Sequence, residues 1–349
     1  LSWNMKTDYP MYNLKPELTN SFEVGLTMRF LKDFNLDVTY YHTNTKNQTF
    51  DPQISTGSGS SKIYVQSGDV MNQGLEMNLG FGHTWGIFTW NTNYTLSMNE
   101  NKIIALADNV WNPETESYFS VSQLDMKGLG QAHFILRKGG SLGDLYSLSD
   151  FKYDSNDKVM VDVNGKVNVI PISDESDYVK LGSVLPKANL AWNNSFSYKG
   201  INAGFLLTAR LGGIVYSATQ AYLDLYGVSE TSAAARDAGG VWVNGRSRVN
   251  PQSFYEVVAS QSGLPTYYTY SATNLRLQEA HIGYTIPRRW LGNVCDINVS
   301  LVGRNLWMIY CKAPFDPEAV ATTNNYYQGI DYFMMPSTRN FGFNVKINF

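Results

Sequence analysis

The sequence has no run of about 18 apolar residues, so it contains no transmembrane helix. It also has few charges, since charged residues make up 16% of the chain, against roughly 25% in a typical soluble domain. The formal net charge is −3 and no basic cluster is present, which argues against nucleic acid as a partner. A protein that crosses a membrane with strands remains open, because its signal is much weaker per segment.

Cysteine and histidine are scarce too. Cys295 and Cys311 are the two cysteines, and one expected strand carries most of their separation, so they should lie roughly 45–50 Å apart. A disulfide needs Cα atoms within about 7 Å, so we expect two free thiols. The four histidines lack metal-ligand spacing, and no nucleophile or phosphate-binding motif is present. We therefore expect no enzyme activity. The histidines are His42, His83, His133 and His281.

Aromatic residues, in contrast, are abundant, with 23 Tyr, 17 Phe and 8 Trp, and they suit strands and membrane interfaces. Residues 340–349 have the sequence N-F-G-F-N-V-K-I-N-F, in which Phe, Val and Ile alternate with Asn, Gly and Lys. Side chains of a strand alternate between its two faces, so this stretch predicts a strand with one apolar face. Because chain ends usually fray, such a regular terminal strand is expected to pair on both sides.

The same alternation recurs at eight other places, which gives about nine strands in all. The slip in phase between Leu277 and Ala280 predicts a β-bulge. The eight further strands are expected at residues 21–30, 34–45, 75–81, 88–98, 188–198, 201–211, 273–286 and 294–309.

The connections between these strands are of two kinds. Within successive pairs of strands they take about two to seven residues, whereas between pairs they run from about 20 to 90. The longest, about 100–185, is expected to be irregular with a small β-meander, and Asn164-Gly165 within it predicts a type I′ hairpin. The loop at about 212–270 shows no period. Alternation of short turns and long loops is typical of an outer-membrane barrel.

Alternation alone does not say whether the apolar face is a protein core or a lipid surface. The opposite face is rich in Asn, Thr, Ser and Gly but poor in Lys, as in a wet lumen, and aromatics gather near strand ends. We therefore predict an all-β, transmembrane antiparallel β-barrel, with a soluble β-rich binding or adhesion protein as the alternative. The strand-end aromatics are Phe81, Trp85, Phe88, Trp90, Tyr198, Tyr284, Trp290, Trp307 and Tyr310.

An odd number of strands does not close an ordinary bacterial barrel. The first residues, from Leu1 to Lys6, have neither the form of a signal peptide nor that of a domain start. We therefore expect residues 1–349 to be the C-terminal portion of a larger barrel, with the remaining strands supplied by another piece.

Several motifs in the expected order resemble one family of transporters. An L-K-P-E segment at residues 14–17 and N-Q-G-L-E at 72–76 resemble strand entries of TonB-dependent receptors. More specific motifs follow, and the ordered set resembles the SusC/RagA branch of TonB-linked outer-membrane transporters. These are N-L-R-L-Q-E at 274–279, I-G-Y-T-I-P at 282–287, G-R-N-L-W at 303–307, D-P-E at 316–318, Q-G-I-D-Y at 328–332 and P-S-T-R at 336–339.

This resemblance implies a barrel of about 22 strands in the outer membrane of a Gram-negative cell, with long extracellular loops and short periplasmic turns. We expect the plug domain, the TonB box and the N-terminal strands to lie outside residues 1–349. The implied partners are TonB, a SusD-like lid lipoprotein and a second transporter–lid pair. The implied function is import of oligosaccharides or peptides. Phe349 resembles the terminal aromatic that serves as an assembly signal in such barrels.

The loop aromatics are candidates for contact with substrate, because their rings can stack on sugar rings or peptide side chains. They could equally contact the lid or fix the loops. The candidates are Trp242, Tyr267, Tyr268, Tyr326 and Tyr327.

No cofactor is expected, with one weak alternative. Acidic and amide side chains at every second residue resemble a calcium loop. Hairpin turns favour the same residues, and the Glu that ends an EF-hand loop is missing, so we favour turns. The residues concerned are Asp154, Asn156, Asp157, Asp162 and Asn164.

Overall fold

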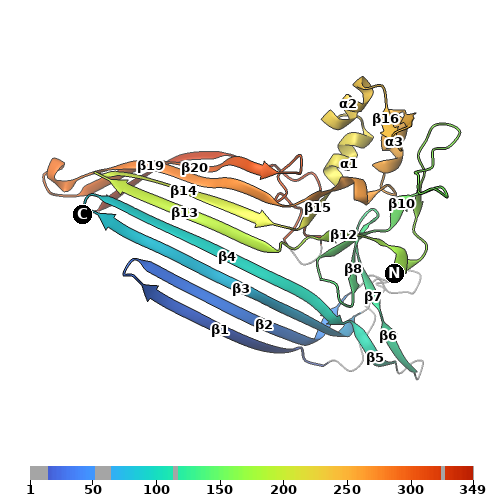
Figure 1. The fold of residues 1–349 in the computed structure, drawn as a ribbon, viewed down its shortest axis with the longest axis horizontal. Helices are drawn as coiled ribbons and strands as arrows, with labels where there is room; N and C mark the ends of the chain where they lie inside the picture. Colours follow the sequence, from blue (N-terminus) through green and yellow to red (C-terminus); the bar gives the residue numbers. More distant parts are fainter. Residues whose placement is uncertain (1–14, 52–63, 113–116, 324–326, 349) are drawn as a thin grey trace, which may run out of the picture.

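The computed structural model describes residues 15–51, 64–112, 117–323 and 327–348. Tyr326 and Phe349, both singled out in the sequence, lie outside the described residues. The main element is a nine-stranded antiparallel sheet whose strands follow one another in chain order (Figure 1). All nine predicted strands are therefore confirmed. They are β1 (Leu18–Phe30), β2 (Phe34–Phe50), β3 (Val65–Trp85), β4 (Phe88–Ala105), β13 (Ala188–Tyr198), β14 (Ile201–Leu211), β19 (Asn274–Ile286), β20 (Asp296–Cys311) and β22 (Asn340–Asn348).

Strand β3 begins about ten residues before the predicted start. The backbone of its first part pairs with the end of β2 as far as Phe50 and Val65, although the sequence there lacks apolar alternation. The early strand was missed because backbone pairing continues beyond the stretch in which one face is apolar. The predicted bulge in β19 is confirmed, since Leu206 pairs with Glu279 and Leu207 with Leu277, which leaves Gln278 as the extra residue.

The short connections all lie at one end of the sheet, where β22 also ends, and the long ones at the other (Figure 1). Tyr198 faces Ile201 across a two-residue turn, in which Lys199 and Gly200 both have positive φ, of 45° and 88°. This is the turn geometry that suits the twist of a hairpin. The four short connections comprise residues 31–33, 86–87, 199–200 and 287–295, the last containing η4 (Arg288–Trp290).

We number the loops after β4, β14 and β20 as the first, second and third long loops. The first of these is more ordered than expected. The predicted small meander is present as β7, β8 and β9, with β12 on its edge. The elements are β5 (Ala107–Asn112), β6 (Ser117–Val121), β7 (Gln123–Leu129), β8 (Ala132–Arg137), β9 (Asp144–Ser147), β10 (Ser149–Phe151), β11 (Val169–Pro171), η2 (Glu175–Asp177) and β12 (Val179–Ser183).

The type I′ turn predicted at Asn164-Gly165 is wrong. A bridge joins Val161 to Val167, so a hairpin is present, but of these two residues only Gly165 has positive φ. The amide of Gly165 donates to the carbonyl of Asp162, which makes a type I turn followed by a glycine bulge. The Asp162 carboxylate decides this geometry, because it accepts hydrogen bonds from the amides of Asn164 and Lys166.

The second long loop contains helices that its lack of period did not reveal. The side chains of Ser217, Ser229 and Asn250 each cap one helix, and Pro251 takes the first helical position of α3. Each helix has eight residues, which is too short for a clear apolar stripe. The elements here are β15 (Ile214–Ser217), α1 (Ala218–Leu225), α2 (Glu230–Asp237), β16 (Val241–Val243), β17 (Ser247–Val249), α3 (Pro251–Val258), η3 (Pro265–Tyr268), β18 (Thr269–Ser271) and, in the third loop, β21 (Ile330–Asp331).

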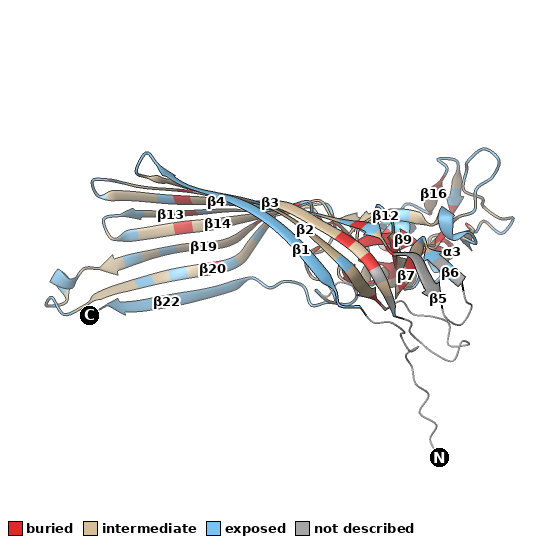
Figure 2. Ribbon diagram, turned by 90° about the horizontal axis from the view of Figure 1, so that it is seen from below, coloured by how far each residue is buried: buried red, intermediate tan, exposed pale blue. Residues whose placement is uncertain are grey.

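The hydrophobic core lies among the loops and not along the sheet. Figure 2 shows buried residues concentrated at the loop end, whereas most of the nine-stranded sheet is exposed or half-buried. Among the described residues, no second layer covers the apolar face of the sheet, and many of its large apolar side chains are exposed. No helix in the described ranges is long and apolar enough to cross a membrane.

Candidate functional site

One face of the sheet is polar across six strands. Residues that face each other across antiparallel strands lie on the same side of the sheet. Glu76 of β3 faces Thr39 of β2 and Ser97 of β4, and Asn189 of β13 faces Arg210 of β14. The neighbouring row runs through Asp37, Asn78, Thr95, Ala191, Thr208 and Arg276.

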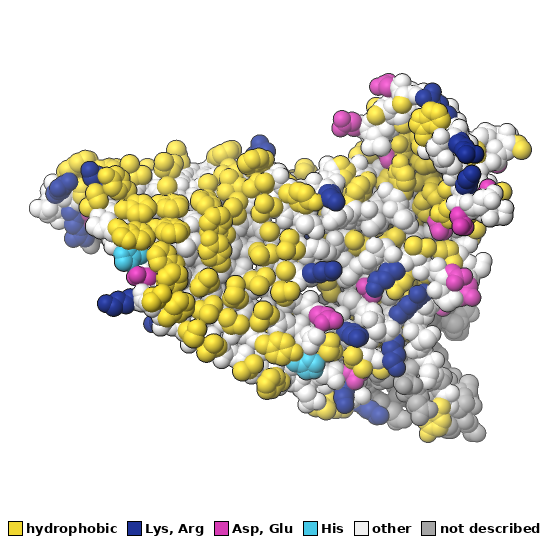
Figure 3. All heavy atoms as spheres, in the orientation of Figure 1, with side chains coloured by type: hydrophobic (Ala, Val, Ile, Leu, Met, Phe, Trp, Pro, Cys, Tyr) yellow, Lys and Arg dark blue, Asp and Glu magenta, His cyan; other side chains and the backbone are white. Residues whose placement is uncertain are grey.

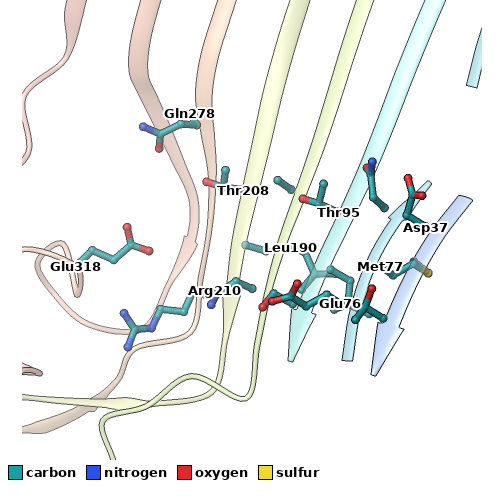
Figure 4. Close-up of a pocket in the computed structure, with 16 residues that line it drawn as sticks. Asp37, Glu76, Met77, Thr95, Leu190, Thr208, Arg210, Gln278 and Glu318 are labelled. Carbon is teal, nitrogen blue, oxygen red and sulfur yellow. The ribbon is translucent and has the colours of Figure 1, made fainter. Parts of the chain in front are cut away.

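A cavity of about 680 Å³ opens over these two rows. Figure 4 shows side chains from β2, β3, β4, β13, β14 and β19 around it, with Glu318 reaching in from the loop after β20. Asp37, Glu76 and Glu318 are its acidic groups and Arg210 is its basic group. The cavity is thus a polar hollow, which fits the wet lumen expected from the sequence.

The other face carries an apolar belt, which we define as the outward residues from Leu75 to Trp85 on β3 and their cross-strand partners. Eleven residues at about 3.4 Å each, tilted by roughly 40–45°, span about 25–28 Å, close to the apolar band of a membrane barrel. Figure 3 shows hydrophobic side chains covering this face, with charged side chains at its two ends. At the loop end the belt stops where Gln73 donates to Glu100 at 2.8 Å.

Aromatic rings border the belt at the turn end, as the sequence predicts. Trp85 stacks on Phe88 with centroids 6.1 Å apart, and Tyr284 lies 6.4 Å from Trp290. Such rings typically mark the interface between hydrocarbon and headgroups.

Two tryptophans inside the belt have their indole N–H groups paired. Trp192 donates to the Thr92 hydroxyl at 2.9 Å, and Trp90 donates to the Asn194 side-chain oxygen at 3.1 Å. Thr92 and Asn194 are therefore polar residues on an apolar face that accept hydrogen bonds from these two indoles. In hydrocarbon an unpaired N–H group costs several kcal/mol, so this pairing suits a lipid-facing surface.

The loop after β20 is fixed to the polar face by a buried ion pair. The Arg276 guanidinium donates to both oxygens of Asp316, at 3.2 and 2.8 Å, and lies 3.3 Å from Glu318. Burial raises the pKa of Asp316, but the bonds from Arg276, Ser337 and the Glu318 amide outweigh it and lower the pKa overall. Two motifs of the sequence, N-L-R-L and D-P-E, thus contribute the two halves of one clamp.

All three long loops join in one body. Strand β15 of the second loop pairs with β18 and, in parallel, with β21 of the third. Asn244 links the second loop to the first, because its side chain exchanges two hydrogen bonds with the backbone of Val159, at 3.1 and 2.8 Å. Val184 of the first loop is buried against the same core as Ile330. We call this unit the loop body.

The predicted loop aromatics fall into two groups. Trp242, Tyr267 and Tyr327 are 58%, 39% and 37% exposed, and the Arg248 guanidinium lies 4.7 Å from the Trp242 ring centre. Tyr268 is 1% exposed and donates to the Asp224 carboxylate at 3.0 Å. This burial and this bond suit the fixing of the loop, which is one of the roles left open for Tyr268. Within the described residues, no ring contact joins Trp242 to Tyr267 or Tyr327.

An aromatic cluster missed by the sequence reasoning joins two loops. Tyr222 of α1 packs against Tyr332 and Phe333, with centroids 6.1 and 5.6 Å apart. The Phe333 amide donates to the Thr219 hydroxyl at 2.7 Å. The sequence signal that could have revealed this cluster is the run Tyr332-Phe333-Met334-Met335, four large apolar residues in succession within a loop.

The acidic stretch proposed as a weak calcium alternative forms two matching hairpin turns. The Asp154 carboxylate accepts from the amides of Asn156 and Lys158, as that of Asp162 does from Asn164 and Lys166. One oxygen of each carboxylate, Oδ1, is thus engaged in turn capping. Among the described residues, no group of His, Cys, Asp and Glu is arranged to hold a metal. The two cysteines are free thiols, as predicted.

Comparison with known proteins identifies the family. The model of the family described as "TonB dependent receptor-like, beta-barrel" matches residues 3–306. TonB-dependent receptor P3 of Formosa agariphila is 23% identical, over 97% of this chain and 35% of its own length. Receptor P39 of the same organism is 21% identical, over 92% and 34%. The chain therefore spans about a third of the length of these relatives.

Solved structures agree on the fold. The RagAB peptide importer in its closed-closed state matches with a TM-score of 0.68 and 16% identity, over 95% of this chain and 35% of that one. Its open-open state matches with a TM-score of 0.61 and 15% identity, over 95% and 34%. The resemblance to SusC/RagA-type transporters is thereby confirmed at the level of fold. The chain belongs to the TonB dependent receptor-like, beta-barrel family.

Proposed function

We propose that this chain forms part of the barrel of an outer-membrane importer that takes up large nutrients with energy supplied through TonB. The observation that carries the proposal is the contrast between the two faces of the nine-stranded sheet. One face is polar and hollowed, and the other is apolar over about the height of a bilayer's hydrocarbon core. A wall between lipid and a wet lumen needs both properties. Membership of the family supports TonB as the source of energy.

The edges of the sheet support its place in a larger barrel. Among the described strands, β1 pairs only with β2, and β22 only with β20. Unpaired backbone groups in hydrocarbon cost several kcal/mol each, so both edges need partners. We place residues 1–349 as the C-terminal portion of a barrel of about 22 strands, whose remaining strands, plug and TonB box belong to the rest of the protein.

The loop body is the proposed docking surface for a SusD-like lipoprotein that acts as a lid. Its common core and the Arg276–Asp316 clamp hold the three loops in one shape, which suits a docking surface. Trp242, Tyr267 and Tyr327 are exposed on it and are our candidates for contact with cargo or lid. Two such transporter–lid pairs are proposed to form a dimer.

The cargo is proposed to be an oligosaccharide or a peptide. RagAB is a peptide importer, but at 16% identity that likeness carries the fold alone. Exposed aromatic rings suit both sugar rings and peptide side chains. No catalytic step is proposed, in keeping with a family of receptors and transporters.

Uptake by cells tests this function. The full-length receptor and its lid are expressed in an outer-membrane host, and entry of fluorescent peptides and of fluorescent oligosaccharides is measured with and without TonB. We expect TonB-dependent entry of one class and not the other. Entry that is unchanged without TonB, or entry of neither class from mixtures that cover both, would contradict the proposal.

A further inference from the structure

We propose that the turn end of the sheet binds anionic phospholipids of the bilayer through a row of exposed cations. We call this surface the turn rim and define it as residues 31–33, 86–87, 199–200 and 287–295, which connect the strands at that end. The inference rests on the proposed placement of the sheet in the outer membrane. Figure 3 shows Lys and Arg side chains gathered at this end, beyond the hydrophobic belt.

The cations of the turn rim are available to an anion. Lys32, Lys199 and Arg289 are exposed, and within the described part of the chain none has a carboxylate within 4.0 Å. The neighbouring acids are already engaged: Asp33 lies 2.7 Å from His83, and Asp296 lies 3.2 Å from Arg288. The rim therefore presents unpaired positive charge.

Each cation has an apolar side chain close to it in the chain. Leu31 precedes Lys32 and Trp290 follows Arg289, and both apolar side chains are exposed. The Lys199 ammonium lies 5.5 Å from the centre of the Tyr198 ring. Apolar and aromatic groups beside cations suit a boundary between hydrocarbon and headgroups. A soluble acidic protein bound at the rim would match the cations but would leave these apolar groups without a partner.

An apolar groove near Lys32 offers room for part of an acyl chain. It has a volume of about 240 Å³ and lies on the outer face of β2, β3 and β4. Phe34, two residues after Lys32, forms one end of its lining. The other lining residues are Leu79, Phe81, Trp90, Thr92 and Tyr94.

The rim cations and the apolar groove together indicate which molecule binds at the turn rim. A cation beyond an apolar belt is matched by a molecule with a negative phosphodiester above two hydrocarbon chains. Short turns face the periplasm in barrels of this kind, so the lipid comes from the periplasmic leaflet. A zwitterionic headgroup offers the rim no net charge, and we therefore assign preference to an anionic phospholipid such as phosphatidylglycerol.

Competition between two lipids tests the assignment. The full-length receptor is delipidated, mixed with equimolar phosphatidylglycerol and phosphatidylethanolamine, and the lipids it retains are counted by native mass spectrometry. We expect enrichment of phosphatidylglycerol. The triple variant Lys32→Gln, Lys199→Gln and Arg289→Gln should reduce the enrichment by roughly tenfold or more, because each cation near a membrane surface contributes about a fivefold preference.

A matched triple variant at the loop end, Lys158→Gln, Lys166→Gln and Arg246→Gln, should keep the enrichment. Equal retention of the two lipids by the native receptor, or unchanged enrichment in the rim variant, would overturn the inference. Displacement of phosphatidylglycerol by inorganic phosphate alone would overturn the lipid assignment in favour of a simple anion site. Heat-dependent electrophoretic migration first verifies that each variant is a folded barrel, and failure of the native receptor to insert into bilayers would contradict the proposed function instead.

Discussion

Two residues at matching turn positions show how a single side chain sets local geometry. Asp157 and Gly165 each follow a capping aspartate by three residues and adopt positive φ, of 56° and 74°. Their amides donate to the carbonyls of Asp154 and Asp162, at 3.2 and 3.0 Å. Glycine adopts this conformation without strain, whereas an aspartate pays some energy for it.

Substitutions at Asp157 and Gly165 are therefore predicted to have opposite effects on the free energy of opening the two turns. Asp157→Gly should stabilise the first hairpin by up to about 1 kcal/mol, and Gly165→Asp should destabilise the second by about 1 kcal/mol. Hydrogen exchange at the amides of Asp154 and Asp162, which close the two hairpins, reports the local opening free energy. Changes of the same sign in the two variants would contradict the role given to these positions.

Asp224 makes the stability of the loop body depend on pH. Burial raises the pKa of its carboxyl above the ordinary value of 3.8, and the bonds from Ser229 and Tyr268 offset this only in part. An acid with a raised pKa binds its proton more tightly in the folded state. Stability should therefore be highest below the ordinary pKa and fall as pH rises through the folded pKa.

Hydrogen exchange in α1 and η3 between acidic and neutral pH measures how the stability of the loop body depends on pH. Opening should become easier as pH rises in the native protein, and the dependence should be weaker in Asp224→Asn. The Tyr268→Phe variant removes a donor to the carboxylate and should destabilise the loop body by about 1–3 kcal/mol at neutral pH. An equally steep pH dependence in Asp224→Asn would assign the effect to another group.

At the scale of elements, one clamp joins the third loop to β19. The Arg276 and Asp316 side chains are only 6% and 9% exposed, so removing one partner leaves a buried charge unpaired. Asp316→Asn should destabilise the segment between β20 and β22 by about 3 kcal/mol. Arg304→Gln is the control, because Arg304 pairs with Glu279 while 68% exposed and should change stability by less than about 1 kcal/mol.

Limited proteolysis of the folded receptor within residues 312–339 reads out this difference. Cleavage should become faster in Asp316→Asn and stay near the native rate in Arg304→Gln. Because the pKa of Asp316 is lowered, the clamp should also weaken as pH falls through that pKa, the opposite sign to Asp224. Equal protection of the two variants would show that the core of the loop body, and not the clamp, holds the segment.

The strands were predictable because their signal is local. In β14 every second residue is apolar, and in β13 Asn194 is the single exception on the apolar face. The turn at Lys199-Gly200 lies directly between the two strands. The helices of the loop body were not found, since eight residues carry too little periodicity, although Ser217, Ser229 and Asn250 were available as cap signals.

The site was predictable only in part, for a physical reason. The polar face follows from alternation, but the cavity needs Glu318, which the clamp to Arg276 brings in from a distant loop. Tyr267 and Tyr268 are adjacent and chemically alike, yet one is exposed and the other is buried against Asp224, 44 residues away. Such differences depend on tertiary contacts that composition does not encode.

For the whole molecule, the central claim is that the two faces of one sheet meet different surroundings. The sheet separates a polar hollow from an apolar belt, and the three long loops form one body at its end. Neighbouring residues on one strand therefore face lipid and lumen in turn. Strand β3 offers three positions that test this within a few residues of one another.

The decisive measurement is the free energy of unfolding of Leu79→Arg, Leu75→Arg and Asn78→Arg, each in the full-length receptor folded into phospholipid vesicles. Leu79 lies in the middle of the belt, so the arginine should cost about 2–4 kcal/mol there. Leu75 lies at the loop edge, where the cost should be about 0–1 kcal/mol. At Asn78 it enters the cavity opposite Asp37 and should cost little. Equal costs at Leu79 and Leu75, or the largest cost at Asn78, would contradict a lipid-facing belt.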